Sequence, residues 1–229
     1  MLLDYRQLSP LLAALDGDGT APRLDHLKQD LAEVMDAYQQ PRYSFVLRRV
    51  PDLLVRAQLA AHAHTEDERL AAFRLAALAG QSAAMILTKL GEPDLAWIAA
   101  QRGLAAAEQS EDPAVIGSLM RSLIHALHTH GRPLDAMNMT RTAADFLNRR
   151  LDSSRPALLS IYGTLLLPGA VAAARAGDRA TAKDYPRLAR RLHHGKAAHT
   201  DRRHHPVPRT RPPHPLIASP EAVGPLPVS

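Results

Sequence analysis

Three glycines, each standing between two helical segments, constrain the fold more than any other feature of this sequence. They are Gly91, Gly131 and Gly177. Small residues recur five and twelve positions after each of them, at Ala96 and Gly103, Ala136 and Ala143, and Ala182 and Ala189. A glycine can adopt the left-handed conformation that ends a helix, and small residues about two turns apart let the next helix approach its partner closely. The sequence therefore predicts a series of antiparallel helix pairs, each joined by a glycine turn.

Apolar residues in the rest of the chain follow the spacing of helices. A stripe at intervals of three and four residues marks the first helix: Leu24, Leu27, Leu31, Val34, Met35 and Tyr38. Further helices are expected over residues 45–63, 66–90, 93–110, 113–130, 133–150, 154–177 and 178–192. No segment alternates between apolar and polar residues as a half-buried strand would. The predicted fold class is all-α, with about seven or eight helices arranged as a solenoid of antiparallel pairs.

The sequence also predicts local features at two prolines and at the start of one helix. Pro51 and Pro168 fall inside expected helices, where proline removes a backbone hydrogen bond. We expect each to kink its helix or, at Pro51, to split it. Thr65 followed by Glu68 has the pattern of a capping box, in which both side chains bond to backbone N–H groups at a helix start.

The chain divides into three parts by composition. Residues 1–23 are predicted to be a linker with a short helix, residues 24–192 the helical-repeat domain, and residues 193–229 a disordered tail rich in proline, histidine and arginine. Residues 187–229 hold eight Lys or Arg and two acids, against 20 basic and 21 acidic residues before them. The high pI thus belongs to the tail, and specific binding of nucleic acid by this chain alone is not expected.

Cysteine is absent, which excludes disulfides, zinc–thiolate sites and thiol catalysis. The first residues lack the basic start and apolar run of a signal peptide. The longest apolar stretch, residues 158–174, contains polar residues and a proline and is shorter than the ~20 residues that span a bilayer. We therefore expect a cytoplasmic protein without a membrane partner.

Side chains suited to catalysis or metal binding occur without the partners that such chemistry needs. One cluster at a helix junction consists of His62, His64, Glu66 and Glu68. The two histidines lie about 200° apart around a helix axis, so a solvated helix end is the plainer interpretation. The sequence has no glycine-rich phosphate loop and no nucleophile-elbow motif. It predicts no catalytic, cofactor or metal site, and hence no enzyme.

A set of basic and polar side chains is expected to line a groove formed by the first helices of the pairs. It consists of Gln81, Lys89, Arg121, His125, His128 and Arg175. His125 and His128 share a helix face with Arg121, but a metal would need a third ligand. Such a basic groove would suit an acidic peptide or a carboxylate ligand. The alternative is an ordinary polar helix face.

The glycine turns with small residues at these offsets resemble the tetratricopeptide repeat, although the glycines stand 40 and 46 residues apart rather than about 34. A narrower resemblance is carried by AYQQ at 37–40 with Tyr43-Ser44, LGEPDLAWIAA at 90–100, LSIYG at 159–163 and AAARAGDRATA at 172–182. These runs resemble the C-terminal half of Xre-type helix-turn-helix transcriptional regulators from high-GC bacteria. In that family a DNA-binding domain and a linker precede tetratricopeptide-like helices. The 23 residues before Leu24 are too few for that DNA-binding domain.

Two functions are compatible with these observations. The first is a non-catalytic domain related to bacterial regulators that binds a protein, a peptide or its own copy, or acts as a sensor. The second is a truncated or frameshifted remnant of such a regulator with no activity of its own, because GC-rich codons read in another frame yield the Arg, Pro and His that fill the tail. A remnant is expected to aggregate, since a shortened array exposes an apolar face.

Overall fold

The computed structural model describes residues 21–151 and 156–193, and these residues form eight α-helices joined by short turns. The helices are α2 (Leu24–Gln39), α3 (Tyr43–Ala63), α4 (Glu66–Leu90), α5 (Pro93–Gln109), α6 (Pro113–Thr129), α7 (Pro133–Asn148), α8 (Pro156–Arg175) and α9 (Arg179–His193). This part of the chain contains no strand, so the all-α prediction is confirmed for it. The predicted linker lies outside the described residues except for 21–23, and the predicted tail except for His193.

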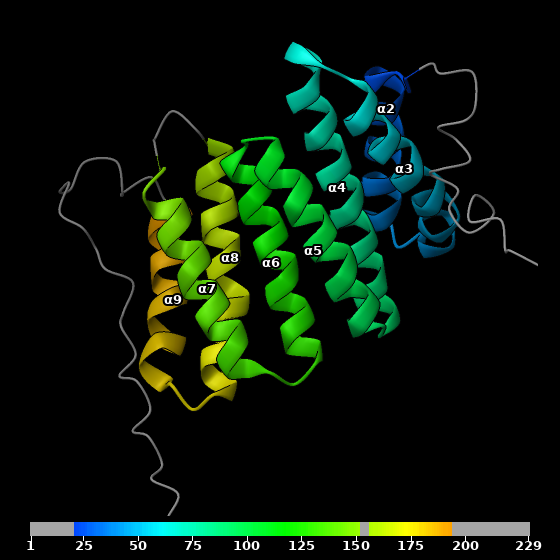
Figure 1. Cartoon of the computed structure of the whole chain (residues 1–229). Helices are drawn as coiled ribbons and strands as arrows, with labels where there is room; N and C mark the ends of the chain where they lie inside the picture. The colour runs from blue at the N-terminus through cyan, green and yellow to red at the C-terminus, as the bar shows by residue number, and fades with distance from the viewer. Residues whose placement is uncertain (1–20, 152–155, 194–229) are drawn as a thin grey trace, which may run out of the picture.

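The helices form two layers (Figure 1). Each helix packs against the next one in the chain, and α2, α4, α6 and α8 also pack against one another in that order. Among the described helices, α3, α5, α7 and α9 make no such contacts with one another. The even-numbered helices therefore form a continuous inner layer, and each odd-numbered helix covers the junction beside it.

The three predicted glycine turns have the same geometry. The φ angles of Gly91, Gly131 and Gly177 are 76°, 67° and 80°, in the left-handed region. In each turn the glycine N–H donates to the carbonyl three residues earlier, and the next N–H donates to the carbonyl five residues earlier, at 2.9 to 3.3 Å. These bonds satisfy carbonyls at the helix end that would otherwise lack a partner. The left-handed turn predicted from the sequence is confirmed at all three positions.

The small residues after the turns lie at helix contacts, most tightly between α4 and α5. Ala96, Ala136 and Ala143 are fully buried. Ala182 and Ala189 are half-buried because they lie on α9, which among the described helices packs against α8 alone. At Gly103 the backbone of α5 meets Gly80 of α4. A Cβ on Gly80 would lie 2.8 Å from the Gly103 Cα, so the two backbones touch without side chains between them.

Two local expectations fail. The split at Pro51 does not occur: α3 continues through this proline, as α8 does through Pro168, because buried neighbours such as Val50 and Leu165 hold each helix by packing and only one backbone bond is lost. The kinks at the two prolines stay predictions. The capping box is not formed, since Thr65 makes no side-chain capping bond. Glu68 instead lies 2.6 Å from Nδ1 of His64, which competes for its carboxylate.

Two helices are long and apolar enough to cross a membrane by length and composition, over Glu68–Leu90 and Pro156–Arg175. The second is longer than the 17-residue stretch considered from the sequence. Neighbouring helices bury 61% of the apolar window in the first and 50% in the second. At least half of each apolar window is therefore buried by packing inside the protein.

The contact between α4 and α5 predicts that alanine substitution destabilises the protein at Gly80 but stabilises it at Gly163, a glycine of α8 outside this contact. Gly80→Ala should lower the free energy of unfolding by about 2 kcal/mol, because the new methyl meets backbone atoms that cannot rotate away. Gly163→Ala should raise it by about 0.5–1 kcal/mol, because the nearest atom would be 3.9 Å away and alanine favours the helix. Urea unfolding followed by circular dichroism measures both. Equal effects of the two substitutions would show that the backbones can separate at no cost.

Candidate functional site

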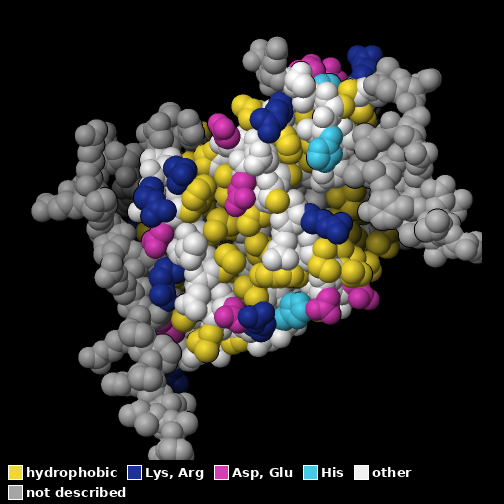
Figure 2. Space-filling model, viewed as in Figure 1, with side chains coloured by type: hydrophobic (Ala, Val, Ile, Leu, Met, Phe, Trp, Pro, Cys, Tyr) yellow, Lys and Arg dark blue, Asp and Glu magenta, His cyan; other side chains and the backbone are white. Residues whose placement is uncertain are grey.

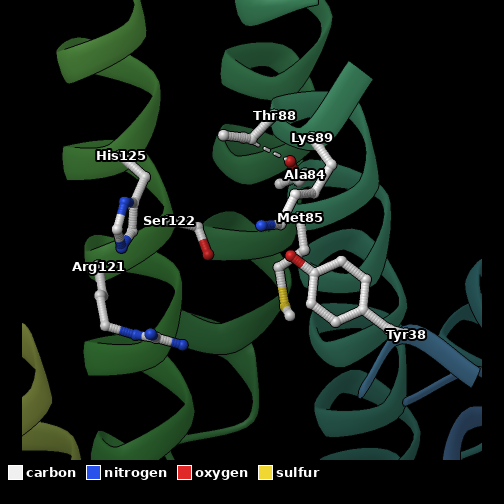
Figure 3. A pocket seen from close by; sticks show the side chains of 8 residues that line it. All are labelled: Tyr38, Ala84, Met85, Thr88, Lys89, Arg121, Ser122 and His125. Atoms are coloured by element: carbon white, nitrogen blue, oxygen red, sulfur yellow. Dashed lines mark hydrogen bonds between the residues drawn. The ribbon is translucent and has the colours of Figure 1, made fainter. Parts of the chain in front are cut away.

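A cavity of about 370 Å³ opens on the inner layer, where α2, α4 and α6 meet (Figure 3). It is lined by Tyr38 from α2, by Ala84, Met85, Thr88 and Lys89 from α4, and by Arg121, Ser122 and His125 from α6. Helical spacing explains how two helices supply most of the wall. Met85 and Lys89 are four residues apart on α4, and Arg121 and His125 are four residues apart on α6, so each pair shares one face.

The hydroxyl groups in the cavity are mostly occupied by their own helices. The Thr88 hydroxyl donates to the Ala84 carbonyl at 2.8 Å, and the Ser122 hydroxyl donates to the Ser118 carbonyl at 3.3 Å. Such bonds to the preceding turn are ordinary for serine and threonine inside helices. The nitrogen atoms of Lys89, Arg121 and His125 therefore dominate the polar chemistry of the cavity.

The cavity brings basic side chains together, and no carboxylate lines it within the described part of the chain. Nε of Arg121 is buried and makes no hydrogen bond within the described part of the chain. Burial lowers the pKa of Arg121 below its usual value, and the nearby Tyr38 acts in the opposite direction. Burial also raises the pKa of Tyr38, with Tyr43 adding to this effect and Arg121 opposing it. The site is an electropositive hollow with unused donor capacity.

The imidazole of His125 responds most strongly to this environment. Burial, together with the charges of Arg121, His128 and Lys89, lowers the pKa of His125 to about 4. By surface area His125 is nevertheless an exposed residue, although it is crowded by neighbouring atoms, so a molecule entering the cavity can reach its ring. At neutral pH the unliganded site holds a neutral His125 beside two cations.

The structure brings three of the six predicted groove residues together: Lys89, Arg121 and His125. The other three lie elsewhere. Gln81 is buried with only 7% of its surface exposed, and Arg175 is exposed at the end of α8. Nε2 of His128 donates to the carbonyl of Pro168 at 2.7 Å, which joins α6 to α8.

Sequence reasoning missed Tyr38 and Met85 as lining residues. The sequence places Tyr38 in the apolar stripe of the first helix, and its position near the end of that helix is the available signal.

A second hollow lies along α9, where the described lining residues are Asp184, Arg187, Arg190 and Arg191. Arg187 there is paired with Asp184 at 3.5 Å, so its charge is already partly balanced.

A group of three or more His, Cys, Asp or Glu side chains that could hold a metal does not occur within the described residues. At the junction of His62, His64, Glu66 and Glu68, the ring of His64 is hydrogen-bonded to Glu68 and to the carbonyl of Pro22.

Comparison with known proteins found no matching family model, no matching curated protein and no matching solved structure. The inner-layer cavity is accordingly the feature on which an assignment of function has to rest.

The lowered pKa of His125 predicts how stability depends on pH. The unfolded chain holds a proton at this position below its usual pKa of about 6.5, whereas the folded chain does not until about 4, so stability falls as the pH drops through this window. Because the side chain is partly exposed, we expect a loss of only about 1 kcal/mol at pH 5. Urea unfolding at about pH 6.5 and about pH 4 measures this loss of unfolding free energy, which should be smaller for His125→Gln than for the unaltered chain. The control is His62→Gln, at an exposed position of α3; if both variants behave alike, His125 is not responsible.

Proposed function

We propose that this chain is a non-catalytic binding domain of the tetratricopeptide-like kind, related to the C-terminal domains of Xre-type transcriptional regulators. The three glycine turns of equal geometry and the alternation between an inner and an outer layer support a solenoid of helix pairs. In such an array the inner layer is the surface that holds a partner. The partner is a peptide, a protein segment or a second copy of the chain.

The convergence of Lys89, Arg121 and His125 in the inner-layer cavity is the observation that carries the proposal. Two helices contribute these side chains, and no acid among residues 21–151 and 156–193 lines the cavity to neutralise them. An acidic side chain of a partner would supply the missing negative charge and accept a hydrogen bond from Nε of Arg121. The groove therefore favours an acidic partner over a neutral one.

Catalysis is not supported by the same cavity. The Ser122 hydroxyl donates to its own helix, which leaves no serine–histidine pair poised for nucleophilic attack. The lining residues that the structure describes offer no carboxylate that could act as a general acid or base. On the face shown in Figure 2, basic and acidic side chains are interspersed, which is unlike the one-sign surface that binds a nucleic-acid backbone.

A short glutamate-containing peptide labelled with a fluorophore provides the test. The same peptide with glutamine in place of glutamate is the neutral control. Fluorescence anisotropy with the full chain should show binding that is about tenfold tighter for the glutamate peptide and that weakens as salt is added. Arg121→Gln should remove that preference, whereas Arg102→Gln, at an exposed position of α5, should keep it. Equal binding of the two peptides would rule out the groove as an acidic-partner site.

A remnant of a regulator is the second candidate, and one observation favours it. Leu167 and Val171, four residues apart on α8, are 51% and 48% exposed, which leaves an apolar stripe on an inner-layer helix. Size-exclusion chromatography and thermal melting of the full chain separate the two candidates. A binding domain should be monodisperse and melt cooperatively, and aggregation with a gradual melt would identify the remnant.

A further inference from the structure

The inner-layer cavity has the size of a site for a small molecule, and its wall has a basic part and an apolar part. Its volume of about 370 Å³ falls in the range of small-ligand pockets, about 300–1,000 Å³. Figure 3 shows the Arg121 guanidinium and the Lys89 side chain directed into the space between α4 and α6, with the Tyr38 hydroxyl approaching it from α2. We infer that this cavity binds a small organic acid, a single carboxylate on a short apolar body, and that binding is accompanied by proton uptake at His125.

The basic part of the cavity accounts for the carboxylate. Arg121 and Lys89 come from different helices and face the same space, so one oxyanion between them can bond to both. Nε of Arg121 is buried without a hydrogen-bond partner in the described part of the chain, which is costly unless a ligand accepts that bond. A carboxylate matches the planar guanidinium in shape as well as in charge.

The remaining wall accounts for the apolar body. Ala84, Met85 and the ring of Tyr38 line the cavity beside the cations. The methionine side chain is flexible and polarizable, so it can adapt to ligands of somewhat different shape. A free inorganic anion would leave this apolar surface unused. The combination therefore favours an amphipathic acid over a phosphate ion.

The position of His125 couples binding to protons. The groups that act on its ring are Arg121 and His128 on α6 and Lys89 on α4, while α2 contributes Tyr38 to the same cavity and α8 contributes the Pro168 carbonyl that holds His128. Repulsion by these cations and burial keep the ring neutral in the empty site. A bound carboxylate offsets one of the two positive charges and offers an acceptor, which raises the pKa of His125, so that its ring takes up a proton and becomes a further donor to the ligand.

This inference rests on the proposed binding function, and calorimetric titration of the full chain with hexanoate tests it. Hexanamide is the neutral match, hexanesulfonate is an acid that stays ionised at low pH, and inorganic phosphate is an anion without an apolar body. We expect hexanoate to bind about tenfold more tightly than hexanamide and phosphate. Lys89→Gln and Arg121→Gln should each weaken hexanoate binding about tenfold, while Arg102→Gln should leave it unchanged.

The proton uptake has its own readout. Hexanesulfonate affinity should rise roughly tenfold from about pH 8 to about pH 5, because only the protein titrates in that series. His125→Gln should abolish this rise and His62→Gln should preserve it. A pH-independent affinity in the unaltered chain would overturn the role of His125.

The remaining outcomes are distinguishable from failure of the proposed function. Equal binding of hexanamide, equal binding of phosphate, or no binding of hexanoate would each overturn the small-acid site. If the glutamate peptide still binds through Arg121 in that case, the acidic-partner function stands and the small-acid site alone is rejected. If neither the peptide nor hexanoate binds, both proposals fall.

Discussion

Where α4 crosses α5, the two helix backbones lie so close that Gly80 could not carry a side chain without displacing Gly103 and the helix to which it belongs. The same place determines the position of α6. A Cβ on Gly103 would lie 2.7 Å from Cδ1 of Leu119, so this fully buried leucine of α6 occupies the space that the glycine leaves. Arg121 follows two residues later. The packing of three helices at one point thus places the arginine across the cavity from Lys89 at the end of α4.

The same packing shows what could be predicted from the sequence. Gly91, Gly131 and Gly177 act through local backbone geometry, and local geometry leaves a readable pattern of turn glycines and spacing. The offset from Gly91 predicts a small residue at Gly103. Gly80 has no such signal, because nothing within α4 distinguishes it and its role exists only where α5 passes.

The candidate site was half predictable for a related reason. Periodicity alone assigns Arg121 and His125 to one face of α6, and Lys89 is assigned to the corresponding face of α4 through the helix-pair repeat. His128 lies almost one turn beyond His125 along α6, where α8 rather than α4 is its neighbour, and its Nε2 donates to the Pro168 carbonyl. Tyr38 joins the site only because α2 packs against α4. Periodicity gives the face of a helix, whereas the neighbour that meets each part of that face depends on the tertiary arrangement.

Nearly all the contacts that build these two layers join helices that are adjacent, or next but one, in the chain. Such a protein has a low contact order, because few residues must meet partners that are distant in sequence. The entropy lost in closing loops is therefore small at every step, and structure can begin at any helix pair and extend to its neighbours. During synthesis, each pair can fold soon after its second helix leaves the ribosome, with the surface of the preceding pair already present to receive it.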